Sequence, residues 1–296
     1  MKKSVLLSLV TMIFVVLLLT PGCKAEKKGE QSTPETPKKP VIAVSIVPQK
    51  AWAEAVCGDL AEIVVLVPPG NSPANYEPTP QEMEQFSKAR LYFALGVPTE
   101  EANILPRTED IEGIKIIKLQ EEVASVYPDL EIAPGNRDPH IWLSPKRAMI
   151  MVTAIAREMS ELDPTNKEAY LSNAESYLAE LEALDKEIKV ALTGIEDGKF
   201  IVFHPAFGYL AADYGLEMFA LEQDGKEATP QRLQEMIDLA KRENIKAIFY
   251  QEEISGKQAE AFAEEIGGRT VQLAPLSAQY IENLRGMAEV LTDVMK

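Results

Sequence analysis

Histidine and cysteine are both scarce in this chain. Its 296 residues include two histidines, His140 and His204, and two cysteines, Cys23 and Cys57. So few residues of these types exclude an HExxH zinc-protease motif as well as CxxC redox and zinc-ribbon patterns. The sequence also lacks a GxSxG hydrolase motif and a glycine-rich phosphate or dinucleotide loop. We therefore predict that the protein is not an enzyme.

Positive charge is also in short supply. Lysine and arginine total 30 against 46 aspartates and glutamates, so the formal net charge is -16. A surface of this sign repels phosphate backbones, and we therefore predict no nucleic-acid partner. Apolar residues make up 46% of the chain, which is ample for a hydrophobic core.

The N-terminal segment is typical of export. Lys2 and Lys3 precede an apolar run that ends in "TPGC", and Cys23 closes that stretch. We predict a lipoprotein-type signal peptide over residues 1–22 and a lipid on Cys23, with the protein outside the cytoplasmic membrane as an anchored lipoprotein or in the periplasm. An uncleaved run would instead anchor the chain directly. Residues 23–40 are charged and rich in Pro, Ser and Thr, which predicts a flexible tether.

The rest of the chain alternates short apolar runs with helical patterns. Near-continuous apolar strands that alternate with helices are typical of a parallel sheet covered on both faces. We predict an α/β fold with two four-stranded parallel lobes, the first over residues 41–143 and the second over residues 195–296. The predicted strands are 41–47, 62–68, 90–96 and 114–119, then 199–204, 217–223, 246–253 and 270–276. Cys57 lies in a helical apolar pattern, which predicts a buried thiol.

A long helical stretch separates the two lobes. Residues 144–194 contain two helices, and the second, over 164–194, would be roughly 45 Å long. Its apolar stripe comprises Tyr170, Ala174, Tyr177, Leu178, Leu181, Leu184, Ile188 and Leu192. We expect this helix to join the lobes rigidly, with a ligand cleft between them.

Both histidines fall where such a cleft would form. Ligands of open parallel sheets bind beyond the carboxyl ends of the strands. His204 ends a predicted strand, and His140 lies in "DPH", where the chain crosses between lobes. Structural histidines are the alternative, but two imidazoles with added carboxylates would suit Zn or Mn. The further candidates near strand ends are Glu222, Gln251, Glu252 and Glu77.

Several motifs resemble one known family, the substrate-binding lipoproteins of zinc and manganese ABC transporters (cluster A-I metal receptors). They are "LVPPGNSPANYEPTPQEMEQFSKARLYFALG", "DPHIWLSPKRA", "FHPAFGYLAADYGLE" and "IFYQEEISGKQAEAFAEEIGGRTVQLAPL". The resemblance covers about residues 40–296. It implies a monomeric receptor outside the membrane, held there by its N-terminal lipid, which passes a metal ion to a permease and ATPase complex.

The resemblance also implies four metal ligands, and this chain departs from that set. Two of the four correspond to His140 and His204. The first motif has Ala74 where the family has His, and the last has Ala274 where the family has Asp. Alanine cannot coordinate a metal, so the usual four-ligand site cannot form.

Three hypotheses remain for the site. First, His140 and His204 bind Zn or Mn, with other donors recruited. Second, the pocket accepts a metal chelate or another small molecule, for which the two alanines leave room. Third, the site is vestigial in a surface adhesion or scaffold protein. A hydrolytic two-histidine metal centre is chemically possible but foreign to the family. Tyr76 is a further candidate residue of the cleft. Under the second hypothesis, the apolar walls of the pocket would be formed by Tyr76, Trp142, Phe207 and Tyr209.

Overall fold

The computed structural model describes residues 39–195, 198–222, 226, 228–253 and 256–296. The predicted signal segment, most of the tether and Cys23 lie outside these residues. Residues 39–296 form one compact unit by themselves. This unit contains its own hydrophobic cores, so we expect it to fold without the segment before it.

The first lobe is built on a four-stranded parallel sheet in the order β2-β1-β3-β4. Its central strands β1 and β3 are buried along their whole length, as expected for a sheet covered on both faces. The strands are β1 Val41–Val44, β2 Glu62–Val65, β3 Leu91–Ala94 and β4 Lys115–Lys118. The helices are α2 Val47–Cys57, α3 Pro80–Phe86 and α4 Leu119–Ala124, with short 3-10 and π turns at Gly58–Leu60, Glu100–Ile104 and Leu105–Asp110.

The second lobe repeats this plan with a parallel sheet in the order β10-β9-β7-β8. Its strands are β7 Lys199–Val202, β8 Glu217–Ala220, β9 Ala247–Gln251 and β10 Arg269–Leu273. Its helices are α7 Gly208–Tyr214, α8 Pro230–Arg242, α9 Lys257–Glu265 and α10 Tyr280–Met295. The predicted α/β class with two four-stranded parallel sheets is therefore confirmed.

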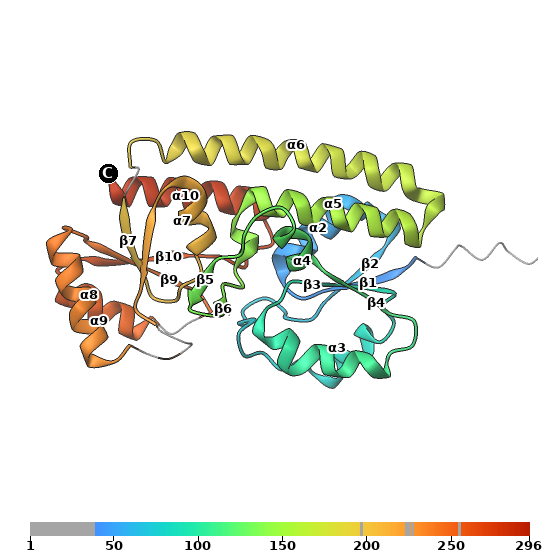
Figure 1. Ribbon diagram of the computed structural model, residues 1–296, viewed down its shortest axis with the longest axis horizontal. Helices are drawn as coiled ribbons and strands as arrows, with labels where there is room; N and C mark the ends of the chain where they lie inside the picture. Colours follow the sequence, from blue (N-terminus) through green and yellow to red (C-terminus); the bar gives the residue numbers. More distant parts are fainter. Residues whose placement is uncertain (1–38, 196–197, 223–225, 227, 254–255) are drawn as a thin grey trace, which may run out of the picture. The chain divides into compact units, whose positions relative to one another are not determined.

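Two antiparallel helices connect the lobes. They are α5 Pro145–Leu162 and α6 Lys167–Ala191, with a 3-10 turn at Pro164–Asn166 between them and another at Ile141–Leu143 before them. α6 packs on α5, on α2 of the first lobe and on α10 of the second (Figure 1). The buried residues of α6 are Tyr170, Ala174, Leu181, Leu184 and Ile188, which belong to the predicted stripe. The largest core is continuous from the first lobe through these helices to the second.

The apolar runs extend further than the strands that they contain. Val47, expected as the last residue of a strand, instead forms the first turn of α2 together with Pro48, where proline is favoured because its missing N–H costs nothing. His204, expected as the last residue of a strand, lies two residues beyond β7. A small antiparallel hairpin, β5 Glu131–Ala133 with β6 Asn136–Arg137, was not predicted.

Among the residues that the structure describes, no helix has both the length and the apolar character needed to cross a membrane.

Candidate metal centre

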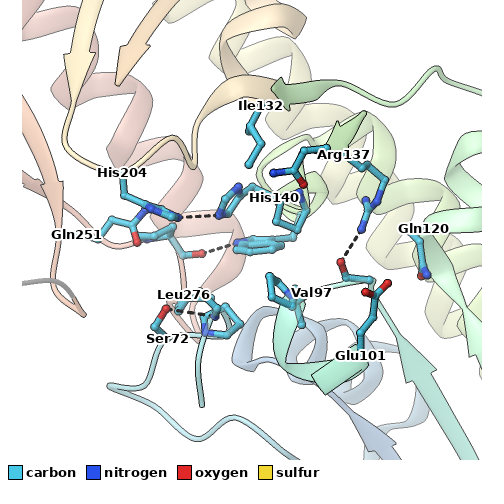
Figure 2. A pocket seen from close by; sticks show the side chains of 18 of the residues that line it. Ser72, Val97, Glu101, Gln120, Ile132, Arg137, His140, His204, Gln251 and Leu276 are labelled. Atoms are coloured by element: carbon cyan, nitrogen blue, oxygen red, sulfur yellow. Dashed lines mark hydrogen bonds between the residues drawn. The ribbon is translucent and has the colours of Figure 1, made fainter. Parts of the chain in front are cut away.

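A pocket of about 620 Å³ lies between the carboxyl edges of the two sheets (Figure 2). The first lobe contributes the loops after β2 and β3, and the second contributes the ends of β7, β9 and the segment after β10. The lining residues are Ser72, Pro73, Ala74, Gly96, Val97, Pro98, Glu101, Gln120, Ile132, Gly135, Asn136, Arg137, Pro139, His140, Trp142, His204, Gln251, Pro275 and Leu276.

His140 is held by the residue two places before it. Asp138 Oδ1 accepts a hydrogen bond from the backbone N–H of His140 at 2.9 Å and lies 2.7 Å from His140 Nδ1. Asp138 is 2% exposed and the histidine 7%. Burial lowers the pKa of His140 below its usual value, although the bond with Asp138 acts in the opposite direction. The imidazole is therefore poised to be neutral, which is the form that binds metals.

His204 is held in the same way by a neighbouring strand. β8 pairs with β7, so the segment after β8 lies beside the segment after β7. Glu222 Oε2 is 2.8 Å from His204 Nδ1, and both side chains are largely buried. Each histidine thus has a carboxylate at Nδ1, which fixes the proton there and leaves the lone pair on Nε2.

The two free nitrogens face one another. His140 Nε2 and His204 Nε2 are 3.2 Å apart, and the rings meet nearly edge to face at an interplanar angle of 80° (Figure 2). At this distance one nitrogen can donate a hydrogen bond to the other if it carries the proton; if both protons sit at Nδ1, the two lone pairs repel unless a cation lies between them. Two nitrogen ligands bound to one tetrahedral zinc at the usual bond length are about 3.3 Å apart. The spacing therefore matches two ligands of one ion.

The structure brings only some of the other candidates to this point. Gln251, the last residue of β9, lines the pocket beside His204, whereas Glu222 lies behind His204 and reaches its Nδ1 instead of the pocket. Glu252 is exposed and does not line the pocket. Glu77 is exposed and pairs with Arg107 at 3.3 Å.

Of the four residues that were expected to form apolar walls, only one lines the pocket. Trp142 does so, and its Nε1 donates to Pro275 O at 2.8 Å. The Tyr76 hydroxyl turns away to the Glu82 carboxylate, 2.9 Å from Oε2. Phe207 and Tyr209 are 1% and 0% exposed, because they form part of the core between the lobes instead of a wall.

Comparison with known proteins adds an independent line of evidence. The family model described as "ZnuA: Zinc-uptake complex component A periplasmic" matches residues 42–294. The chain belongs to this family. The resemblance inferred from the motifs is therefore confirmed.

Individual members of the family share the fold and much of the chain. The high-affinity zinc uptake system protein ZnuA of Bacillus subtilis is 29% identical over 269 residues, covering 86% of this chain and 84% of that protein. The manganese-binding lipoprotein MntA of Halalkalibacterium halodurans is 28% identical over 247 residues, covering 80% and 78%. A crystal structure of ZnuA matches with a TM-score of 0.82 at 37% identity, covering 88% of this chain and 100% of the other.

Ala74 and Ala274, the two positions where the resemblance implied further ligands, both lie near the carboxyl edges of the sheets. Ala74 lines the first-lobe wall of the pocket, and Ala274 lies just after β10, followed by Pro275 and Leu276, which line it. No third His, Cys, Asp or Glu joins the histidines in a metal-binding group within the described residues. The described residues therefore offer two imidazole donors at this point, with methyl groups at the two positions where the resemblance implied further ligands.

Sequence reasoning missed two residues that shape the site. Asp138 precedes His140 in "DPH", and that spacing was the available signal for an orienting carboxylate. Arg137 donates to Gly96 O at 2.7 Å and Leu95 O at 3.3 Å, and so ties the hairpin to the first lobe. Gly96 has φ +79°, and a Cβ there would overlap the Arg137 guanidinium, so only glycine suits this crossing. No sequence signal pointed to this contact.

Proposed function

We propose that this protein captures a divalent transition-metal ion between its lobes and delivers it to the membrane permease of an ABC importer. The observation that carries the proposal is the pair of facing Nε2 atoms 3.2 Å apart, each with a carboxylate at its Nδ1. This pairing of ligand and orienting carboxylate is the arrangement that transition-metal sites use. His140 and His204 are the proposed ligands.

Zinc fits this pair better than manganese. Imidazole nitrogen is a borderline donor that suits zinc, whereas manganese prefers oxygen donors. The carboxylates of Asp138 and Glu222 bind the Nδ1 atoms of the two histidines and are not aimed at the ion. The donors that the protein offers to the ion are therefore nitrogen atoms. We therefore propose zinc as the preferred ion and manganese as a weaker competitor.

The position of the protein in the cell follows from its family and its N-terminus. The family comprises periplasmic components of zinc uptake. We propose that Cys23 carries the lipid anchor, that the receptor acts as a monomer, and that exposed surfaces of both lobes dock on a permease coupled to an ATPase. Metabolic labelling with a fatty acid tests the anchor, because Cys23→Ser would lose the label.

Calorimetry tests the metal site directly. The chain from Lys24 to Lys296 should bind zinc with measurable heat, and His140→Ala or His204→Ala should abolish that heat because one remaining imidazole holds the ion too weakly. Glu77→Gln is the matched control, since Glu77 is exposed and paired outside the pocket. Absence of heat with zinc, with manganese and with their complexes with small chelators, together with no metal in the purified protein, would reject the proposal.

A further inference from the structure

We propose that the cargo is a complex of the metal with a small carboxylate-bearing chelator, of the amino-acid or hydroxycarboxylate class, and that Gln251 and Arg137 recognise the chelator. This inference rests on the proposed function, because His140 and His204 would bind the metal ion of that complex. Four observations carry it: the small number of protein donors, the space, a buried amide and a guanidinium that forms no salt bridge within the described residues.

The first observation is the small number of donors. A tetrahedral zinc needs four ligands, and within the described part of the chain only two side chains converge on one point. The wall opposite is formed by Ala74 and Pro73 from the first lobe, with Pro275 and Leu276 from the second. None of these side chains can coordinate. Two positions on the ion are therefore left for donors that arrive with the cargo.

The second observation is the size of the pocket. Its volume of about 620 Å³ falls within the range of roughly 300–1,000 Å³ that is typical of sites for small organic ligands. One ion with two waters needs far less, because a water occupies about 30 Å³ in the liquid. Ala74 and the prolines of the wall leave this space open beside the histidines.

The third observation is a buried donor with nothing to bind. Gln251 is 6% exposed and lines the pocket, and its Nε2 has no hydrogen-bond partner among the residues that the structure describes. A buried amide left unpaired costs about 1–3 kcal/mol, so such groups in native proteins call for a partner. β9 lies between β7 and β10, which places Gln251 between His204 and Ala274 at the sheet edge. An acceptor on a ligand bound to the metal would lie within its reach.

The fourth observation is a positive charge on the pocket wall. Arg137 lines the pocket on the His140 side, across from Gln251 in Figure 2. Its hydrogen bonds go to the carbonyl oxygens of Leu95, Gly96 and Asp138, and it makes no ion pair with any carboxylate of the described residues. Its charge acts on the buried carboxylate of Glu100, and Glu101 lines the same pocket. In a chain of net charge -16, a guanidinium that forms no salt bridge and lies beside a pocket still favours an anionic ligand.

These four features call for one kind of molecule. Its nitrogen or oxygen donors fill the two open positions of the metal, and its carboxylate accepts from Gln251 Nε2 in the field of Arg137. An amino acid or a hydroxycarboxylate has both functions within a few atoms. Binding breaks no covalent bond, and the protein recognises the metal and the organic anion together.

A pair of matched zinc complexes tests the proposal on the chain from Lys24 to Lys296. L-Histidine and histamine share an amine and an imidazole, but only histidine has a carboxylate. We expect the 1:1 zinc–histidine complex to bind at least tenfold more tightly than zinc–histamine and zinc alone in calorimetry. Zinc citrate serves as the hydroxycarboxylate probe. Native mass spectrometry should show protein, zinc and a carboxylate chelator in one complex.

A glutamine pair tests the recognition. Gln251→Met keeps the length of the side chain and removes the donor, and should reduce the preference for zinc–histidine over zinc–histamine about tenfold, the loss expected for one hydrogen bond to a charged group. Gln272→Met on β10 is the control, because Gln272 is exposed and outside the pocket. If the Gln251→Met variant still prefers zinc–histidine over zinc–histamine, the role of Gln251 is overturned. The comparison of the two zinc complexes on the unchanged protein tests the chelate even if the variant does not fold.

The outcomes separate the two proposals. Tight binding of zinc alone, with neither histidine nor citrate retained, overturns the chelate and leaves metal capture intact. If the protein binds neither zinc, nor manganese, nor any of the zinc complexes, both the metal-capture proposal and the chelate proposal are overturned. A ternary complex that requires the carboxylate supports both.

Discussion

At the scale of single residues, the two carboxylates behind the histidines orient the imidazoles of the proposed metal site. Asp138 and Glu222 each fix a proton on Nδ1 and orient one imidazole toward the other. Replacing such a carboxylate costs roughly 10- to 100-fold in metal affinity. We expect Asp138→Asn and Glu222→Gln each to weaken zinc binding by that factor, because the neutral amide polarises the imidazole less. Competition with a fluorescent zinc indicator measures the change.

Circular dichroism should show that both variants stay folded. An affinity within twofold of the unchanged protein would contradict the assigned role.

The same residues show how much of the site could be predicted from the sequence alone. His140 and His204 were predicted because of the segments that contain them, and the structure places their Nε2 atoms 3.2 Å apart. Glu222 was expected as a ligand, yet its side chain reaches the rear of His204. A strand-end position can be inferred from an apolar run, but the direction of a side chain depends on the pairing of β7 with β8. For the same reason Gln251, although predicted, could not be distinguished from Glu252.

At the scale of elements, the lobes were predictable and the loops that build the pocket were not. The apolar runs gave all eight parallel strands, but their carboxyl ends were placed one to three residues too far along. Leu66 and Leu95, near the ends of two of the runs, are buried in the loops that follow and so look like strand in the sequence. Apolar content reports burial, and only backbone pairing distinguishes the strand from the buried loop after it.

One buried carboxylate supports the first-lobe loop that lines the pocket. Glu100 is 0% exposed and accepts from the backbone N–H groups of Leu95 and Gly96 and from the Ser45 hydroxyl. Burial raises its pKa above the usual value, which these hydrogen bonds oppose. Glu100→Ala would leave those donors unpaired, and we expect a loss of about 2–4 kcal/mol in the free energy of unfolding.

Urea unfolding followed by circular dichroism measures this loss. Glu101→Ala is the control, because that side chain is next in sequence but exposed at the pocket rim. The control should change the free energy of unfolding by less than about 0.5 kcal/mol. Equal effects of the two substitutions would show that the carboxylate does not support the loop.

At the scale of the whole molecule, one core runs through both lobes. It includes β1 and α2 of the first lobe, Leu181 and Leu184 of α6, and Phe200 and Phe249 of the second lobe. Packing interactions on this scale couple the parts of a protein into one cooperative unit, and α6 contacts both lobes directly. The lobes are therefore expected to unfold together, and capture or release of cargo should involve small tilts and loop movements instead of wide hinge opening.

Cys57 offers a probe of that coupling. It ends α2, is 0% exposed, and burial raises the pKa of its thiol to about 12. The thiolate is the reactive form, so the native protein should react very slowly with a thiol reagent at pH 8. In the chain from Lys24 to Lys296, where Cys57 is the sole cysteine, thiol labelling in increasing urea should share its midpoint with the loss of helix by circular dichroism. Labelling at clearly lower urea would mean that the first lobe opens alone and that α6 does not couple the lobes.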